Sequence, residues 1–221
     1  EGVQRPAIAV PIPHAHGTAV VIDAGANVDR HPSHLLQFAV MGEVYTEQIH
    51  GIRRPRVGLL NVGEERGKGT KAVQEAYGLL RQANLNFIGN VEGRDIVNGR
   101  VDVIVCDGFV GNIVLKLAEG MAQALLDLLK DGYRRGGLSA KLGAKLSRPV
   151  FRGLKAHIDP AEYGGAPLLG VDGNCIVGHG TSSPLAINNA IALAERFIDL
   201  KVNSLIRARL HSLRLPRSGR A

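Results

Sequence analysis

The fold is decided by the stretch VDVIVCDGFVGN, residues 101–112, in which a short apolar run ends at Asp107 and a glycine-rich turn follows. The run is rich in valine and isoleucine, whose branched side chains favour strands. The apolar pattern after the turn continues to Leu129 and predicts a long helix over residues 112–129. A strand that leads directly into a helix is typical of α/β proteins with a parallel sheet.

The same alternation extends along the chain in both directions. Short apolar runs predict further strands over residues 19–22, 56–62, 86–88 and 176–177. Longer patterns predict a helix that starts at Pro32 and Ser33, with Ser33 as its N-cap, and helices over residues 70–83 and 184–210. We therefore expect an α/β fold of three layers, a mostly parallel sheet with helices on both faces.

The composition agrees with this layout. Hydrophobic residues make up 45% of the 221 residues, whereas aromatic residues make up only 4% and tryptophan is absent. The core must therefore consist of Val, Leu, Ile and Ala, as in sheets that helices cover on both faces. The two cysteines, Cys106 and Cys175, are far apart in the sequence and favour neither a disulfide framework nor a zinc site.

Charge and the absence of targeting signals narrow the class of protein. The formal net charge of +7 predicts an acidic partner, such as a phosphorylated substrate, an acidic carrier protein, anionic lipid or nucleic acid. The sequence has no recognised nucleic-acid motif or aromatic stacking platform, so nucleic acid is disfavoured. No apolar run of about 18 residues and no signal peptide is evident, which predicts a cytoplasmic protein without a membrane-spanning helix. The chain starts at Glu1 rather than Met, and its start resembles the middle of a longer sequence.

Four loops rich in Gly, Asn and acidic residues follow four of the predicted strands, at residues 23–27 (DAGAN), 63–69 (GEERGKG), 89–93 (GNVEG) and 107–112 (DGFVGN). Ligands of open α/β sheets bind beyond the carboxyl ends of the strands, and helices that start there offer free N–H groups to anions. We expect the loops to form one anion-binding site, although ordinary strand-to-helix turns are the alternative. The candidate contacts are Asp23, Asn27, Gly63, Gly69, Thr70, Asn90, Asp107 and Gly111.

Residues 63–69 also resemble a nucleotide-binding P-loop, with Asp107 as the acid that would hold magnesium. A P-loop needs four residues between its glycines and a Ser or Thr after its lysine, whereas Gly63 and Gly67 enclose three and Gly69 follows Lys68. A nucleotide hydrolase is therefore the weaker alternative. Lys68 is the best candidate to bind a single phosphate or a developing oxyanion.

Two further stretches contain histidines that could belong to a catalytic or metal site. In HGTSS, residues 179–183, His179 and Ser182 are candidates to line the pocket, while Ser182 or Ser183 is the expected N-cap of the last helix. No GxSxG pattern surrounds these serines, which disfavours a hydrolase triad. His14 and His16 have no evident third ligand, so we expect a surface loop there and no metal site.

Residues 130–155 form a basic, amphipathic segment. Leucine or valine recurs every four residues from Leu138 to Leu154, and Gly143 and Pro149 predict a break into two short helices. The pattern predicts either a helical hairpin packed on a dimer partner or a surface for an acidic carrier protein or anionic lipid. The cations expected on that surface are Lys141, Lys145, Arg148 and Arg152.

Six stretches in this order closely resemble the bacterial phosphate acyltransferase family, from about Arg5 to about Ala192. They are DAGANVDRHPSHLLQFAVMGEVY (23–45), RVGLLNVGEERGKGT (56–70), NFIGNVEGRDI (86–96), VDVIVCDGFVGNIVLKLAEG (101–120), YGGAPLLGV (163–171) and HGTSSPLAINNAI (179–191). Family chains are longer, and the resemblance implies that roughly their first third has no counterpart here.

The resemblance implies an isocitrate/isopropylmalate dehydrogenase-like fold with a basic helical hairpin insertion, usually in a homodimer. It implies formation of acyl-phosphate from acyl-[acyl-carrier-protein] and inorganic phosphate, without a nucleotide, cofactor or metal. The loop lysine of the family corresponds to Lys68 and the asparagine of its DGFxGN motif to Asn112, which become the expected catalytic residues. Thr70 stands where the family commonly has Asn.

The expected organisation and partners follow from both lines of reasoning. We expect a catalytic core over residues 1–129 and 156–210, the basic helical segment over 130–155 and a flexible basic tail over 211–221. Peripheral contact with the inner face of the membrane and transient contact with glycerol-3-phosphate acyltransferase are implied by the resemblance. The alternatives are a P-loop-like nucleotide hydrolase or an inactive fragment of the acyltransferase.

Overall fold

The side chains of the central sheet alternate between two buried faces. In β2 (Gly17–Ile22), Val20 and Ile22 join the core on one face, whereas Ala19 and Val21 join the core on the other. The computed structural model describes residues 2–29 and 31–213. Its other strands are β1 (Ala7–His14), β3 (Val57–Leu60), β4 (Phe87–Val91), β5 (Val103–Val105), β6 (Ala166–Leu169) and β7 (Ile176–Val177).

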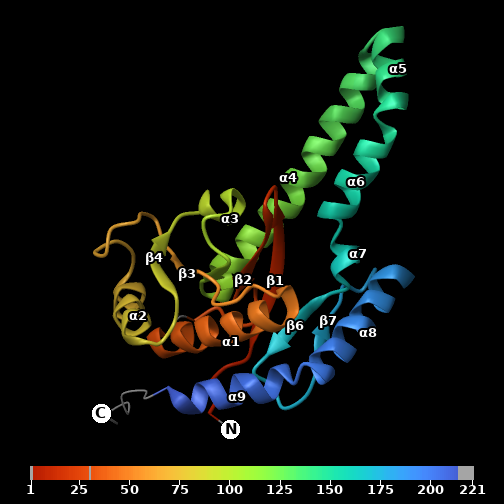
Figure 1. Ribbon diagram of the computed structural model, residues 1–221. Coiled ribbons are helices and arrows are strands. Elements are labelled where there is room, and N and C mark those ends of the chain that lie inside the picture. The colour runs from red at the N-terminus through yellow and green to blue at the C-terminus, as the bar shows by residue number, and fades with distance from the viewer. Residues whose placement is uncertain (1, 30, 214–221) are drawn as a thin grey trace.

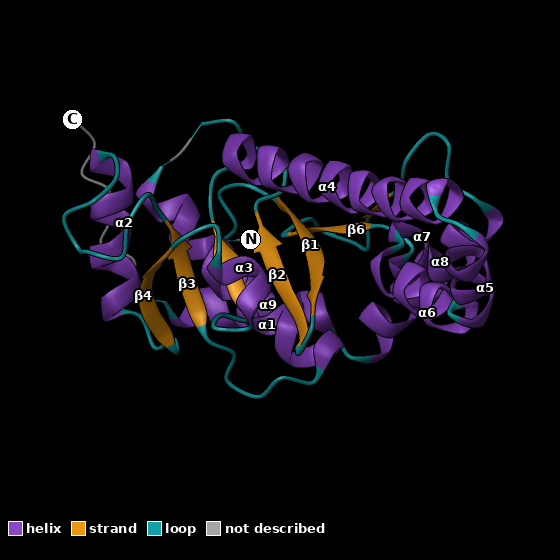
Figure 2. Ribbon diagram, turned by 90° about the horizontal axis from the view of Figure 1, so that it is seen from above, coloured by secondary structure: helices purple, strands orange, loops and turns teal. Residues whose placement is uncertain are grey.

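The seven strands form one mixed sheet in the order β4-β3-β5-β2-β1-β6-β7. The neighbours β4, β3, β5 and β2 are parallel, and the pairs that involve β1, β6 and β7 are antiparallel (Figure 2). The predicted α/β fold is confirmed, and the expected parallel order holds for this half of the sheet. Strands β1 and β6 were not predicted, because Pro11, Pro13 and Pro167 lack the N–H that a central strand donates.

Helices cover both faces, as expected, but to different extents. One face is covered by α1 (Pro32–His50), α2 (Lys71–Gln82), α8 (Pro184–Asp199) and α9 (Val202–Ser212), whose buried side chains share one core with the sheet. Packing there is close, because a Cβ at Gly42 of α1 would lie 2.6 Å from a methyl group of Val103. The smaller second core lies beside α3 (Asp95–Asn98) and the first turns of α4 (Gly108–Arg135).

Several helix boundaries differ from the sequence expectation, and the helix predicted over residues 112–129 extends from Gly108 to Arg135. Helix α1 has His31 as its N-cap, and Ser33 lies in its first turn with its N–H 3.4 Å from His31 Nδ1. The predicted single helix over 184–210 is two helices, because Lys201 adopts φ 52°, a left-handed conformation that ends α8 before α9 begins. Of the predicted basic tail, residues 214–221 lie outside the described residues.

An arm of three helices projects from the body (Figure 1). It consists of α4, α5 (Leu138–Leu146) and α6 (Arg148–Ile158), and α7 (Pro160–Tyr163) leads back to the sheet. The predicted pair of short helices is confirmed, but Gly143 lies inside α5 and the break falls at Ser147. Tyr133 of α4 packs against Phe151 of α6, with 5.6 Å between ring centroids.

Helix α4 is a candidate membrane span by length and composition, although the sequence predicted no such helix. Within the described ranges it is long and apolar enough to cross a membrane by length and composition, and only 6% of its most apolar stretch is buried. Its apolar residues lie along one face and are interrupted by polar ones, which is why no continuous apolar run is visible in the sequence. Core helices of soluble proteins and signal sequences meet the same test, so by itself it is weak evidence for a membrane span.

Candidate functional site

The four loops predicted to form a site lie along one edge of the sheet. Three of them follow β2, β3 and β5, whereas the one predicted over residues 89–93 starts inside β4, which runs to Val91. These four strands are neighbours and all parallel. The carboxyl ends of parallel strands meet at the same edge, where ligands of α/β sheets bind. The loops therefore lie along one edge, and this carboxyl edge is the candidate site; that they form one anion-binding site stays a prediction.

Asp23 shapes the first loop. Its side chain is fully buried, and Oδ1 accepts hydrogen bonds from the N–H groups of Ile8 at 3.0 Å, Gly25 at 3.1 Å and Ala26 at 3.0 Å. Oδ2 accepts from the backbone N–H of Asn27 at 2.7 Å and from its Nδ2 at 2.8 Å. Since hydrogen bonds to a charged acceptor are strong, Asp23 fixes the loop to β1.

The first loop and the start of α4 approach each other closely. A Cβ at Gly111 would lie 1.8 Å from the carbonyl oxygen of Asp23, and one at Gly108 would lie 2.5 Å from that of Asn27. Only glycine fits at these positions, because any larger residue would collide with backbone. The contact sets Asn112, which is exposed on the first turn of α4, beside Gly25.

Asp107 starts α4 at this edge of the sheet. It is the N-cap, and its Oδ1 accepts from the N–H of Val110 at 2.9 Å. Capping of this kind stabilises a helix start by about 1 kcal/mol. The candidate residues Asp23, Asn27, Asp107, Gly111 and Asn112 are thus brought together in one structure made of two loops.

The loop that carries Lys68 is held by three carboxamide side chains. Asn90 Nδ2 of β4 donates to the carbonyl of Glu65 at 2.9 Å, and Asn61 Nδ2 donates to that of Lys68 at 3.0 Å. Gln74 Nε2 of α2 donates to the carbonyls on both sides of Lys68, at Gly67 (2.7 Å) and Gly69 (3.2 Å). The lysine itself is exposed.

One acidic residue of the same loop, Glu64, is directed toward arginines. Glu64 forms a two-pronged ion pair with Arg100, in which Arg100 Nη2 lies 3.2 Å from Glu64 Oε2, and Arg94 Nη2 lies 3.8 Å from Glu64 Oε1. The hydrogen bonds from Arg100 lower the pKa of the Glu64 carboxyl below its usual range. The pairing compensates a charge that would oppose an anion beside Lys68.

Sequence reasoning did not identify Asn61, Gln74 or Arg100. Asn61 and Gln74 lie just outside the quoted loop, and Arg100 lies 36 residues after its partner Glu64. Carboxamides on either side of a glycine-rich loop are a usable signal for the first two, because such loops expose carbonyls that need donors. The role of Arg100 depends on the tertiary contact alone.

Thr70 and Gly69 are positioned at the start of α2. Thr70 is the N-cap residue, but its side chain makes no capping hydrogen bond, so the hydroxyl and the first N–H groups of α2 are not used in a cap. Gly69 has φ 85°, which favours glycine. The start of α2 therefore offers donors at the carboxyl edge.

His179 and Ser182 lie at the opposite edge of the sheet. Val177, at the end of β7, pairs with Ala166 at the start of β6. Just before β6, the hydroxyl of Tyr163 interacts with the side chain of Thr18 at the start of β2. The four loops follow the other ends of the parallel strands, so the chain does not bring His179 and Ser182 to them.

Local hydrogen bonds organise this second edge. His179 Nδ1 lies 2.7 Å from Thr181 Oγ1, and the N–H of His179 donates to Ser182 Oγ at 3.1 Å. Ser183 rather than Ser182 is the N-cap of α8, since its Oγ accepts from the N–H of Ala186.

The first histidine pair lies at the turn between β1 and β2. The expected loop is a tight hairpin in which His14 ends β1, and His14 and His16 have ring centroids 6.3 Å apart. Burial and the nearby His16 lower the pKa of His14. Among the described residues, no group of three or more His, Cys, Asp or Glu side chains is arranged to hold a metal ion.

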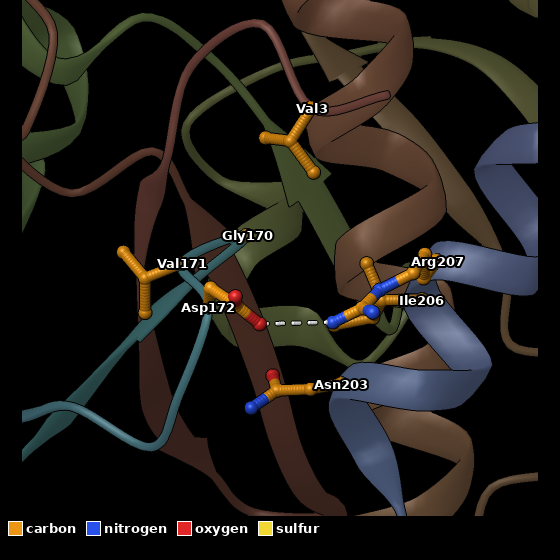
Figure 3. A pocket seen from close by; sticks show the side chains of 7 residues that line it. All are labelled: Val3, Gly170, Val171, Asp172, Asn203, Ile206 and Arg207. Carbon is orange, nitrogen blue, oxygen red and sulfur yellow. Dashed lines mark hydrogen bonds and ion pairs between the residues drawn. The ribbon is translucent and has the colours of Figure 1, made fainter. Parts of the chain in front are cut away.

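A small cavity lies away from the loops, between the segment after β6 and α9 (Figure 3). Its volume is about 30 Å³, which is room for about one or two water molecules. Asp172 and Arg207 form an ion pair of 3.0 Å across it, and Asn203 Nδ2 donates to the carbonyl of Gly173. These polar groups already have partners, so the cavity is not a candidate for a substrate.

Comparisons with known proteins agree with this geometry. Residues 1–205 match the model of a family described as fatty acid synthesis protein. The chain is 49% identical to the phosphate acyltransferase of Pelotomaculum thermopropionicum over 219 residues, which cover 99% of this chain and 64% of that protein. It is 51% identical to the phosphate acyltransferase of Elusimicrobium minutum, over 90% of this chain and 58% of that protein.

The chain therefore spans about three fifths of the length of these relatives. Among solved structures, EutD phosphotransacetylase from Staphylococcus aureus matches 55% of this chain and 44% of its own, with 20% identity and a TM-score of 0.45. Since the family model covers nearly the whole sequence and the resemblance to phosphate acyltransferases is confirmed, the chain belongs to the fatty acid synthesis protein family.

Proposed function

We propose that this chain is the phosphate-binding and catalytic part of an acyltransferase that forms acyl-phosphate from acyl-[acyl-carrier-protein] and inorganic phosphate. The observation that carries the proposal is the carboxyl edge, where four polar loops follow four neighbouring parallel strands. The relatives at about 50% identity are phosphate acyltransferases, and an edge suited to a small anion agrees with that activity. The role lies in bacterial phospholipid synthesis.

The reaction needs no covalent intermediate with the enzyme. An oxygen of phosphate attacks the carbonyl carbon of the thioester, a C–O bond forms and the C–S bond breaks. The carrier leaves as a thiol after it takes a proton, and acyl-phosphate remains. Holding the two reactants side by side supplies much of the rate enhancement, because it makes the attack effectively unimolecular.

Lys68 and Asn112 are the proposed catalytic residues. Lys68 binds phosphate together with the N–H group of Gly69, and its positive charge offsets that of the anion. Gly111 lies beside this site, but its N–H donates to the carbonyl of Asp107 at 2.9 Å. Asn112 Nδ2 donates to the carbonyl oxygen as it becomes an oxyanion. Gly63, Thr70 and Asp107 complete the wall of the site, and Asp23, Asn27 and Asn90 shape it through the hydrogen bonds described above.

Measurement of acyl-phosphate from acyl-carrier protein and phosphate tests the proposal. In a protein that carries this chain, Lys68→Ala and Asn112→Ala are expected to lower kcat about 10²–10³-fold, the usual effect of losing an oxyanion donor. Lys71→Ala is the matched control, because the Lys71 side chain is 92% exposed at the start of α2 and lies 4.0 Å from Glu75. Rates within twofold of wild type for both variants contradict the assignment, and magnesium-dependent nucleotide hydrolysis supports the P-loop alternative instead.

The arm is the proposed surface for the acidic carrier protein and for anionic lipid. Lys141, Lys145, Arg148 and Arg152 are exposed on α5 and α6, and in the described ranges none of them pairs with a carboxylate. Such a basic face attracts acidic partners. In this proposal the protein is cytoplasmic, binds the inner face of the membrane peripherally and contacts glycerol-3-phosphate acyltransferase transiently.

Sedimentation with liposomes separates the two acidic partners. The double variant Lys141→Glu/Lys145→Glu is expected to lose binding to liposomes that contain anionic lipid while neutral liposomes bind neither protein. Carrier-protein binding is measured separately by its effect on KM for acyl-carrier protein. Lipid binding that charge reversal leaves unchanged contradicts the lipid assignment.

The domain bounds and the oligomeric state are also part of the proposal. We assign residues 1–129 and 156–210 to an isocitrate/isopropylmalate dehydrogenase-like catalytic core, 130–155 to a helical insertion and 211–221 to a basic tail. A homodimer formed along the arm is supported by the exposed apolar face of α4. His179 and Ser182 remain predicted site residues. In such a dimer they still lie at the edge of the sheet opposite the four loops.

A further inference from the structure

Four carbonyl groups around Lys68 accept hydrogen bonds from side-chain amides, and that of Glu65 also accepts from the N–H of Lys68 at 3.1 Å. Asn90, Asn61 and Gln74 come from β4, the end of β3 and α2, and together they bind the carbonyls of four loop residues, Glu65, Gly67, Lys68 and Gly69. Gln74 spans the lysine, since its amide reaches the carbonyls before and after it. The backbone of Lys68 is therefore fixed on both sides.

The direction of these carbonyls decides where the loop N–H groups point. In a planar trans peptide the N–H points opposite to the C=O. The carbonyl of Lys68 faces Asn61, so the N–H of Gly69 points away from Asn61, and the carbonyl of Gly69 faces Gln74, so the N–H of Thr70 points away from Gln74. In the described part of the chain neither N–H has an acceptor.

Two further details indicate that the carboxamides act on the loop and not on a ligand. A Cβ at Gly69 would lie 2.5 Å from Asn61 Oδ1, so the arrangement exists only with glycine at that position. Asn90 is 3% exposed and uses its amide nitrogen on Glu65, while its Oδ1 has no hydrogen-bond partner among the described residues. A carbonyl oxygen does not suit a phosphate dianion, whose oxygens accept.

We propose that Asn61, Gln74 and Asn90 are positioning residues for phosphate. They hold the carbonyl dipoles of the Lys68 loop away from the anion and turn the N–H groups of Gly69 and Thr70, with the Lys68 side chain, toward it. This inference rests on the proposed function and adds which residues set the affinity for the phosphate substrate. A site whose donors are fixed before binding loses less conformational entropy when the anion arrives.

Gln74→Met and Asn90→Leu test the inference, because both keep the approximate size of the side chain and remove its donor. Gln82→Met is the matched control, since Gln82 is exposed on the last turn of the same helix and, within the described ranges, makes no hydrogen bond to the loop. Three quantities are measured in the protein that carries this chain. They are binding of inorganic phosphate by calorimetry, amide hydrogen exchange of residues 61–70, and KM for phosphate beside kcat.

Each loop variant is expected to weaken phosphate binding and raise KM for phosphate about fivefold, the factor that corresponds to one hydrogen bond. Loop exchange is expected to rise by a similar factor, while Tm, KM for the thioester and the Gln82→Met variant stay unchanged. Wild-type affinity in both loop variants overturns the inference alone. A wild-type protein that binds no phosphate overturns the proposed site and the inference together.

Discussion

Helices α1 and α4 contain similar apolar residues in opposite surroundings. In α1, Leu35, Phe38 and Met41 are at most 2% exposed, because the helix packs against the sheet and against α2 and α9. In α4, Leu117, Leu125 and Leu128 are 62%, 54% and 70% exposed, and the buried residues of the helix are Gly108 and Gly111 at its start. The body therefore completes its core within the chain, whereas the arm leaves an apolar face uncovered.

The exposed residues of α4 form a stripe rather than a scatter. Ile113, Leu117, Met121, Leu125 and Leu128 recur at intervals of four or three residues and so share one face of the helix. Contiguous apolar surface of this kind marks a site of interaction with a protein or a membrane. Substitutions in the body should therefore change the free energy of unfolding, and substitutions on the arm should change association.

The largest effect is expected where the body and the arm join. Gly111→Ala places a methyl group where the carbonyl oxygen of Asp23 stands, since the Cβ would lie 1.8 Å away. Overpacking against backbone typically costs about 1–3 kcal/mol and occasionally more, and we expect about 3 kcal/mol or more here. Chemical denaturation monitored by circular dichroism measures the loss.

Gly120→Ala is the matched control, because Gly120 lies in the same helix with nothing within 4 Å of its would-be Cβ. Alanine at an exposed helix interior is expected to gain about 0.5–1 kcal/mol over glycine. Equal free energies of unfolding for the two variants would show that the contact between the first loop and α4 is not tight in solution.

The sheet and its edge were largely predictable from the sequence. Apolar runs such as residues 101–106 are bounded by glycine and acidic residues, so local pattern alone located four strands and their loops. Proline concealed β1 and β6, and the left-handed Lys201 concealed the break between α8 and α9. These features depend on tertiary contacts that override local propensity.

The site was predictable only in its composition. Glycine, lysine and asparagine in the loops indicated an anion, but the sequence does not tell that His179 follows a strand of opposite direction. It also does not tell that Asn61 and Gln74 bind the carbonyls around Lys68. Strand direction and hydrogen-bond partners are properties of the folded chain.

A smaller effect is expected from a buried acid in the body. Glu43 of α1 is 2% exposed, and burial raises its pKa from 4.5 to about 6 although Arg209 lies 3.3 Å away. The pKa of Glu43 is higher in the folded chain than in the unfolded chain. Protonated Glu43 therefore contributes its full share to the free energy of unfolding below about pH 4.5. This contribution is lost as pH rises through about 6.

Glu43→Gln should remove this dependence on pH. The change in pKa corresponds to about 2 kcal/mol, by which the wild type should lose more stability than the variant between pH 4.5 and pH 7. Urea unfolding at several pH values measures the difference. The control is Glu75→Gln, because Glu75 is an exposed residue of α2. Parallel curves for wild type and Glu43→Gln would show that the carboxyl stays ionised in the folded chain.

Substitutions on the arm are expected to have the smallest effect on the free energy of unfolding and the largest effect on association of two copies. Leu117→Ser/Leu125→Ser changes two side chains of the stripe that are 62% and 54% exposed, so the free energy of unfolding of the single chain should change by less than about 0.5 kcal/mol. If a second copy covers the stripe, each leucine contributes about 1.5–3 kcal/mol to the interface.

The double variant is then expected to raise the dimer Kd about 100-fold or more, since each 1.4 kcal/mol is a factor of ten. Analytical ultracentrifugation measures the Kd, and Gln123→Ser, a polar exposed position of α4, is the control. A dimer that both variants leave equally tight would place the interface elsewhere. The uncovered face of the arm would then be left for the lipid surface, where the same leucine substitutions should reduce liposome binding.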